Sequence, residues 1–221
     1  MSQKFIVLFD LDGTLVDTAP DLIRAHNHVM KKFGYPSKSI DELRNAVGSG
    51  AKAMMAKDNG KWKWFDEKIQ NEMTDEFISF YGKNILYEST LINGVKEFLE
   101  WCKNQDISMA VCTNKTEFLA IDLLKKIGIY DFFEYVSGYN TFEYCKPDPR
   151  HLLKTIDILD GDKNKSIMIG DSETDANAAK AAEIPMILLK YGYTEKKSEE
   201  IYHNYLIKDF IGIEKIIKKY L

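Results

Sequence analysis

The alternation of short apolar runs with helical stretches is the feature that most restricts the fold of this chain. Apolar runs rich in β-branched and aromatic residues recur at 4–10, 107–112, 133–137, 166–170 and 186–189, and more weakly at 205–208. Stretches with helical periodicity separate them, at 93–104, 116–127, 149–159 and 174–182. Strands and helices that alternate at this spacing predict a parallel sheet covered by helices, so the expected fold class is α/β.

The stretch from 18 to 87 interrupts this alternation. It contains no convincing strand, and helical patterning is found at 21–33, 40–47, 51–57 and 65–81. Pro20 suits the first turn of a helix that begins at this point. About 70 helical residues inserted after the first strand predict two domains, a small helical domain at 18–87 and an α/β core formed by 1–17 and 88–221.

The charge balance and the apolar runs exclude some classes of partner. The chain has 30 basic and 34 acidic residues, and a nucleic-acid-binding protein usually has a basic excess, so we expect no nucleic-acid partner. The longest apolar runs are far shorter than the roughly 20 residues that span a bilayer, so we expect no membrane partner. The N-terminus reaches Asp10 before a signal-peptide core can form, which predicts a cytoplasmic location.

Two aspartates directly follow the first predicted strand, in the segment DLDGTLVD at 10–17. Asp10 and Asp12 are two residues apart at the carboxyl end of the strand, where ligands bind in open α/β sheets. Carboxylates this close repel each other unless one holds a proton or a cation lies between them, and Mg²⁺ prefers such oxygen ligands. One carboxylate could then act as nucleophile and the other as general acid/base. The alternative is a capped turn with surface aspartates.

A second acidic segment, GDSETD at 170–175, follows the strand predicted at 166–170. Helix N-capping alone would explain Asp171 or Thr174, and the carboxylate of Asp175 suits the dipole of the helix that it opens. Asp10 and Asp171, however, both follow strands of one parallel sheet, and the carboxyl ends of such strands meet at one edge. The two segments are therefore expected to form one acidic site.

Two further segments add polar groups at the same edge. Thr113 and Asn114 follow the strand at 107–112, and Lys146 lies beside Pro147 and close to Pro149, which stiffen its backbone. Taken singly, the first two residues are typical of a helix N-cap and the lysine of a solvated surface. Together the four segments offer a nucleophile, an acid, a hydroxyl, an ammonium and a metal site, which are the groups that phosphoryl transfer requires.

These four segments, in this order and over nearly the whole chain, resemble the motifs of the haloacid dehalogenase-like superfamily. The resemblance implies a Rossmann-like parallel-sheet core with an inserted helical cap domain. It also implies that Asp10 attacks phosphorus and that Asp12 protonates the leaving oxygen and then activates water. Thr113, with Asn114 beside it, would bind the phosphoryl oxygens, and Lys146 would neutralise charge on the nucleophile and on the phosphoryl group.

The same resemblance implies a Mg²⁺ cofactor. The ion would be held by Asp10, the main-chain carbonyl of Asp12, and Asp171. Asp175 would support this metal site, either directly or through water.

The segment FDLDGTLVDTAPDL and residues 47–51 most resemble the phosphoglycolate phosphatase-like branch. This implies a magnesium-dependent phosphatase for a small phosphorylated metabolite, with 2-phosphoglycolate as the best single candidate, in a monomer or homodimer. The cap stretches 48–52 and 61–65 are candidates for substrate contacts.

Alternatives within the superfamily are a β-phosphoglucomutase-like mutase, a pyrophosphatase, and another sugar or nucleotide phosphatase. Thr14 slightly favours a phosphatase, since the mutases commonly have valine there. A dehalogenase lacks an acid at the position of Asp12. A phospho-acceptor signalling module, the non-enzymatic alternative, is shorter and lacks the helical insertion.

Overall fold

The computed structural model describes residues 3–43, 47, 54, 67–194 and 196–221, and the structural statements below concern those residues. The helix predicted at 51–57 lies outside the described residues except for Met54. The candidate substrate contacts at 48–52 and 61–65 lie wholly outside them.

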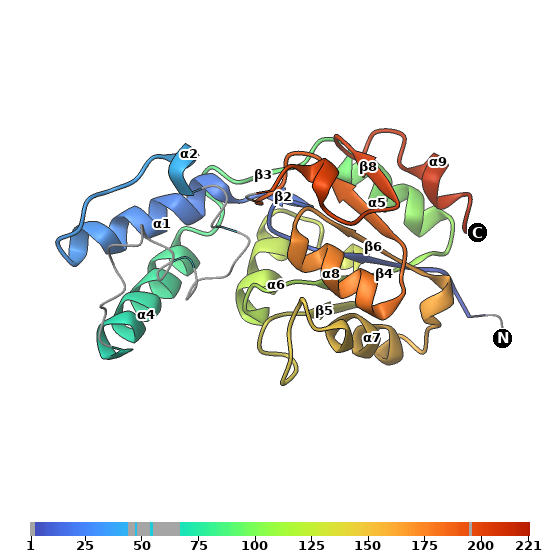
Figure 1. Cartoon of the computed structure of the whole chain (residues 1–221), viewed down its shortest axis with the longest axis horizontal. Helices are drawn as coiled ribbons and strands as arrows, with labels where there is room; N and C mark the ends of the chain where they lie inside the picture. Colours follow the sequence, from blue (N-terminus) through green and yellow to red (C-terminus); the bar gives the residue numbers. More distant parts are fainter. Residues whose placement is uncertain (1–2, 44–46, 48–53, 55–66, 195) are drawn as a thin grey trace.

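Six parallel strands form one sheet in the order β5-β4-β1-β6-β7-β8 (Figure 1). The strands are β1 (Ile6–Phe9), β4 (Ser108–Cys112), β5 (Tyr135–Ser137), β6 (Ser166–Gly170), β7 (Met186–Leu189) and β8 (Tyr205–Ile207). From β1 the chain first adds strands on one side and then on the other, so the strand order reverses beside β1. This reversal is where open α/β sheets bind ligands.

The strand register aligns the carboxyl ends of β1, β4 and β6, which the predicted motifs follow. Phe9 of β1 is the partner of Val111 in β4 and of Ile169 in β6. The residues that follow these three positions, among them Asp10, Thr113 and Asp171, therefore leave the sheet at the same edge.

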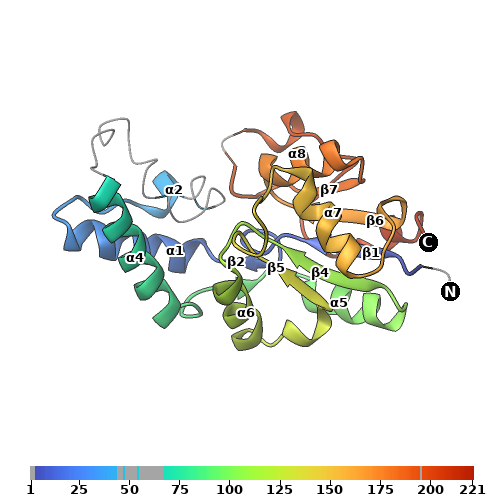
Figure 2. The same ribbon diagram turned by 90° about the horizontal axis from the view of Figure 1, so that it is seen from below.

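Helices cover both faces of the sheet, because the central strands are apolar on both sides (Figure 2). Val7 and Phe9 pack in one hydrophobic cluster, which includes residues of α5 (Val95–Asn104), α6 (Glu117–Lys126) and α9 (Glu214–Ile217). Ile6 and Leu8 pack in the other cluster, with residues of α7 (Pro149–Ile158) and α8 (Glu173–Ala182). Short 3-10 turns complete the core at Tyr130–Phe132, Lys163–Lys165 and Ser198–Glu200. The predicted α/β class is confirmed.

A second group of helices lies beyond the carboxyl edge of the sheet, at the left of Figure 1. It contains α1 (Ala19–Lys32), α2 (Ile40–Leu43) and α4 (Glu67–Lys83), and α1 packs against α4 through apolar faces. Each long helix begins close to its predicted start, and Pro20 lies in the first turn of α1 as expected. No described helix combines the length and the apolar character that a bilayer crossing needs.

The chain crosses twice between the sheet and this helical group, and the two crossings are tied together. We call this connection the crossing ribbon: β2 (Val16–Asp17) pairs antiparallel with β3 (Thr90–Leu91). Asp21 of α1 accepts hydrogen bonds from the backbone N–H groups of 87, 88 and 89, and from the hydroxyl of Ser89 at 2.6 Å. The buried Asp21 thus fixes the returning chain against the start of α1.

Candidate active site

Three carboxylates meet at the carboxyl edge of the sheet. Asp10 follows β1, Asp171 follows β6, and Asp175 lies in the first turn of α8. One oxygen atom of each lies within 4.8 Å of the others, and all three residues are buried. Asp10 and Asp171 therefore lie on the same rim of the sheet, as the two acidic strand ends predict.

Direct contacts join the first motif to Asp171. The Thr14 hydroxyl donates to Oδ1 of Asp171 at 3.0 Å, and the backbone N–H of Tyr193 donates to Oδ2 at 2.7 Å. Gly13 has a φ of +83°, and a Cβ at this position would lie 2.4 Å from Oδ2 of Asp171. Glycine is therefore required at 13 both by the backbone conformation and by the approach of this carboxylate.

Hydrogen bonds occupy both oxygens of the Asp175 carboxylate. Oδ2 accepts from the backbone N–H groups of Asp171 and Ser172 and from the Ser172 hydroxyl, the last at 2.7 Å. Oδ1 accepts from the ammonium of Lys146 at 2.6 Å. Asp175 thus closes the capping box of α8 and at the same time holds the site lysine.

Lys146 is the ammonium that contacts the acidic cluster among the described residues. Its Nζ lies 2.9 Å from Oδ1 of Asp10 as well as 2.6 Å from Asp175, and only 1% of its side chain is exposed. Burial alone would lower the pKa of Lys146, but the carboxylates of Asp10 and Asp175 outweigh it and raise that pKa. The prolines at 147 and 149 therefore follow a lysine that is buried and paired with two carboxylates rather than solvated.

The acidic cluster carries more negative charge than Lys146 can balance. Burial raises the pKa of Asp10 to about 6, although the charge of Lys146 acts in the opposite direction. Burial also raises the pKa of Asp171, and the charges of Asp175 and Asp10 raise it further. Three carboxylates facing one ammonium have an excess negative charge when ionised, which matches the charge of one divalent cation.

The carboxylate of Asp12 lies outside this cluster. The ammonium of Lys115 donates to both of its oxygens, at 2.9 and 3.1 Å. The resemblance assigned the main-chain carbonyl of Asp12, and not its carboxylate, to the metal. The side chain of Asp12 binds a lysine of the loop after β4 and is separate from the three clustered acids, which agrees with that assignment.

Thr113 and Asn114 lie in the loop after β4, as predicted. The Thr113 hydroxyl is buried and accepts from the backbone N–H of Lys115 at 3.1 Å. The Asn114 amide donates to the main-chain carbonyl of Lys146 at 2.8 Å. Asn114 therefore connects the loop after β4 to the segment that carries Lys146.

Comparison with known proteins assigns the chain to a family. The family model for haloacid dehalogenase-like hydrolases matches residues 7–189. The chain belongs to the haloacid dehalogenase-like hydrolases. The resemblance drawn from the four motifs is therefore confirmed.

Relatives of this hydrolase cover nearly its whole length. A phosphoglycolate phosphatase of Agrobacterium fabrum is 37% identical, over 97% of this chain and 94% of the relative. A phosphoglycolate phosphatase of Caulobacter vibrioides is 36% identical, over 95% and 89%. The crystal structure of a predicted phosphoglycolate phosphatase from Haemophilus somnus superimposes with a TM-score of 0.90 at 29% identity, covering 98% of this chain and 99% of that one.

The sequence interpretation of this haloacid dehalogenase-like hydrolase missed two residues that contact the site acids. Lys115 binds Asp12, and Tyr193 binds Asp171 through its backbone. The Tyr193 hydroxyl also donates to Asp17 at 2.6 Å and accepts from the backbone N–H of Ala19 at 2.9 Å. Tyr193 thus joins the acidic cluster to the crossing ribbon. Each residue belongs to a segment that follows a strand, which is the signal that could have found it.

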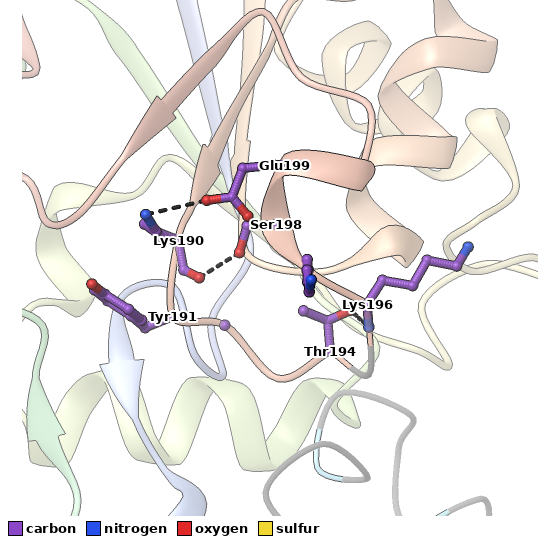
Figure 3. Close-up of a pocket in the computed structure, with 8 residues that line it drawn as sticks. Lys190, Tyr191, Thr194, Lys196, Ser198 and Glu199 are labelled. Atoms are coloured by element: carbon purple, nitrogen blue, oxygen red, sulfur yellow. Dashed lines mark hydrogen bonds and ion pairs between the residues drawn. The ribbon is translucent and has the colours of Figure 1, made fainter.

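A shallow cavity of the hydrolase lies beside this site (Figure 3). It has a volume of about 360 Å³ and is lined by residues between 190 and 199, none of them a predicted site residue. Lys190 and Glu199 form an ion pair across it at 3.1 Å. Gly192 in its lining lies against Asp171, and a Cβ at this position would lie 2.6 Å from Oδ2 of that carboxylate, so one side of the cavity borders the acidic cluster.

Proposed function

We propose that this hydrolase is a magnesium-dependent phosphatase that cleaves small phosphomonoesters, with 2-phosphoglycolate as the best single candidate. The observation that carries the proposal is the meeting of Asp10, Asp171 and Asp175 with Lys146 at the point where the strand order reverses. The names of the curated relatives support the choice of substrate.

The donor atoms of the cluster fit Mg²⁺. They are carboxylate oxygens, which this hard cation prefers, and their excess negative charge needs a divalent partner. Asp10, Asp171 and the main-chain carbonyl of Asp12 would hold the ion. Both oxygens of Asp175 already accept hydrogen bonds, which favours a supporting contact through water. When bound, the ion supplies positive charge beside the phosphoryl oxygens.

Asp10 and Asp12 divide the covalent chemistry in this proposal. A carboxylate oxygen of Asp10 attacks phosphorus, an aspartyl-phosphate forms, and the bond to the leaving oxygen breaks. Asp12 gives a proton to that oxygen, which leaves as the alcohol. Asp12 then takes a proton from water as the water attacks phosphorus, which releases phosphate and restores Asp10.

Lys146 and Thr113 assist without changing covalently. The Lys146 ammonium holds one oxygen of Asp10 in place and offsets the charge of the nucleophile and of the phosphoryl group. The hydroxyl of Thr113 and the amide of Asn114 donate hydrogen bonds to the phosphoryl oxygens. Asp175 keeps Lys146 between the two carboxylates, so the ammonium is positioned before substrate arrives.

The domain division also belongs to this proposal. We assign 18–87 to a cap that closes over the carboxyl edge of the sheet, and 1–17 with 88–221 to the core. The position of α1 and α4 beyond that edge and the crossing ribbon support this division. Closure would exclude bulk water from the aspartyl-phosphate.

A phosphate-release assay tests the proposed function. The purified chain should release inorganic phosphate from 2-phosphoglycolate with Mg²⁺, without any sugar bisphosphate activator, and should lose this activity in EDTA. Asp10→Asn should abolish turnover and leave the fold intact, since an amide does not attack phosphorus. Turnover retained in Asp10→Asn would overturn the mechanism. Absence of phosphate release across a panel of phosphomonoesters and pyrophosphate would overturn the function.

A further inference from the structure

Lys115 is a buried ammonium that the mechanism above does not use. It lies in the loop between β4 and α6, and only 5% of its side chain is exposed. Its Nζ lies 2.9 and 3.1 Å from the two oxygens of Asp12 and 4.4 Å from the centre of the Tyr81 ring in α4. The ammonium is therefore held between the acid/base of the core and an aromatic face of the helical group.

Asp12 is the carboxylate that neutralises Lys115 among the described residues. Both of its oxygens accept a hydrogen bond from this ammonium. When Asp12 carries the proton that it gives to the leaving oxygen, it has no negative charge, so Lys115 loses its ion pair at that stage. Because a buried ammonium that loses a partner is destabilised, a substrate that supplies its own anionic group to Lys115 has an advantage.

The distances place Lys115 beside the leaving group. Proton transfer requires an Asp12 oxygen within about 3 Å of the leaving oxygen. Nζ of Lys115 lies 2.9 Å from the same carboxylate, so the ammonium comes within about 6 Å of the leaving oxygen. In glycolate a single methylene separates the carboxylate from that oxygen. A carboxylate so close to the ester can therefore contact Lys115.

Tyr81 adds a second polar group at this position. Its side chain is buried, and its hydroxyl has no hydrogen-bond partner among the described residues. The face of its ring stabilises the ammonium of Lys115 without neutralising the charge. Lys115 thus remains able to accept an anionic partner when Asp12 turns toward the leaving oxygen.

We propose that Lys115 selects phosphomonoesters whose leaving alcohol carries a carboxylate next to the ester oxygen. The inference rests on the proposed function, because Asp12 must face the leaving group for Lys115 to contact it. Lys115 would then determine substrate specificity from the core, in addition to any substrate contacts made by the helical group.

A comparison of two substrates in the unsubstituted protein, called the parent, and in two Lys115 variants tests this inference. The substrates are 2-phosphoglycolate and 2-hydroxyethyl phosphate, which has the same number of carbons and a neutral hydroxymethyl group in place of the carboxylate. The parent should prefer 2-phosphoglycolate in kcat/KM. Lys115→Met should reduce this preference by about 10- to 100-fold, the range for one charge-assisted hydrogen bond. Lys115→Arg, which keeps a cation, should retain part of the preference.

Lys126→Met is the matched control. Lys126 also forms an ion pair with an aspartate, Asp122, at 2.8 Å, but 46% of its side chain is exposed and it lies in α6. This variant should show the parent's ratio of kcat/KM values for the two substrates. Thermal unfolding of each variant, followed by circular dichroism, shows that the proteins compared are folded.

The outcomes separate this inference from the proposed function. An equal loss of kcat/KM for both substrates in Lys115→Met would show that Lys115 only positions Asp12, and would overturn the inference. A parent that cleaves 2-hydroxyethyl phosphate as well as 2-phosphoglycolate would overturn it too, whether or not the variant folds, and would leave the phosphatase assignment standing. A parent that releases phosphate from neither compound, nor from the wider panel, would overturn both.

Discussion

Replacing Lys146 with methionine tests the electrostatic arrangement of the site through protein stability. Methionine has a similar length and fills most of the space of the lysine side chain, but it has no charge. The substitution removes the ammonium that contacts Asp10 at 2.9 Å and Asp175 at 2.6 Å, in a place where 1% of the lysine side chain is exposed. Three buried carboxylates are then left without their cation in the metal-free protein.

The expected loss is large because the ion pairs are buried. Removing one partner of a buried ion pair costs about 3–5 kcal/mol, since the remaining charge is left uncompensated. For a chain of 221 residues, each kcal/mol lowers the unfolding temperature by about 2–4 °C. Lys146→Met should therefore unfold about 6–20 °C below the parent in EDTA.

Lys163→Met provides the matched control for this measurement. Lys163 pairs with Glu183 at the same 2.6 Å, but 39% of the lysine and 79% of the glutamate side chain are exposed. An exposed pair contributes about 0–1 kcal/mol, so this variant should unfold less than about 4 °C below the parent. Both variants are compared with the parent by calorimetry, in EDTA and in saturating Mg²⁺.

The magnesium dependence should also differ between the proteins. Lys146→Met leaves more uncompensated negative charge, so Mg²⁺ should raise its unfolding temperature more than it raises the parent's. If Lys146→Met is as stable in EDTA as Lys163→Met, the acids are not held together by this ammonium. The electrostatic reasoning about the site would then be wrong.

Three further predictions concern single residues. Asp12→Ala should lower kcat by about 10²–10⁴-fold; activity within twofold of the parent would reject its acid/base role. Asp21→Ala leaves the backbone N–H groups of 87–89 without their acceptor, so it should lower the free energy of unfolding, measured by urea titration, by about 3 kcal/mol. A loss under about 0.5 kcal/mol would show that these hydrogen bonds do not hold the returning chain against α1. Burial lowers the pKa of His26 from 6.5 to about 4, so the unfolded chain binds a proton before the folded one does. The contribution of His26 to the free energy of unfolding should thus be complete above pH 6.5 and decrease as the pH falls toward 4. This decrease should amount to about 2 kcal/mol between pH 7.5 and 5. His26→Gln should show a correspondingly smaller loss over this range, and an unchanged pH dependence would rule out the contribution.

The sheet was predictable because its signals are local. The runs at 166–170 and 186–189 coincide with β6 and β7, since each is apolar throughout and buried on both faces. The run at 133–137 was two residues too long, because a 3-10 turn at Tyr130–Phe132 precedes β5 and places Phe133 outside the strand. The boundary depends on how the turn packs, which an apolar pattern does not reveal.

The clustering of acids was predictable for a different reason. Parallel strands bring their carboxyl ends together, so sequence position alone indicated that Asp10 and Asp171 would meet. The same rule places Lys115 and Tyr193 at this edge, since each follows a strand, but it does not predict which side chains they contact. Each reaches more than 100 residues along the chain, to Asp12 and Asp17, and depends on the direction in which a loop leaves its strand. The two-residue strands of the crossing ribbon are likewise too short to give a periodic pattern.

The crossing ribbon has a consequence for how members of such a family can diverge. Because Val16 faces Leu91 and Asp17 faces Thr90, the chain leaves the sheet and returns to it at adjacent points. Any helical insert whose two ends lie one strand spacing apart can therefore be grafted between these points without moving Asp10 or Asp171. Evolution can therefore replace the insert as one unit and change which substrates reach the site, while the residues proposed for phosphoryl transfer stay the same.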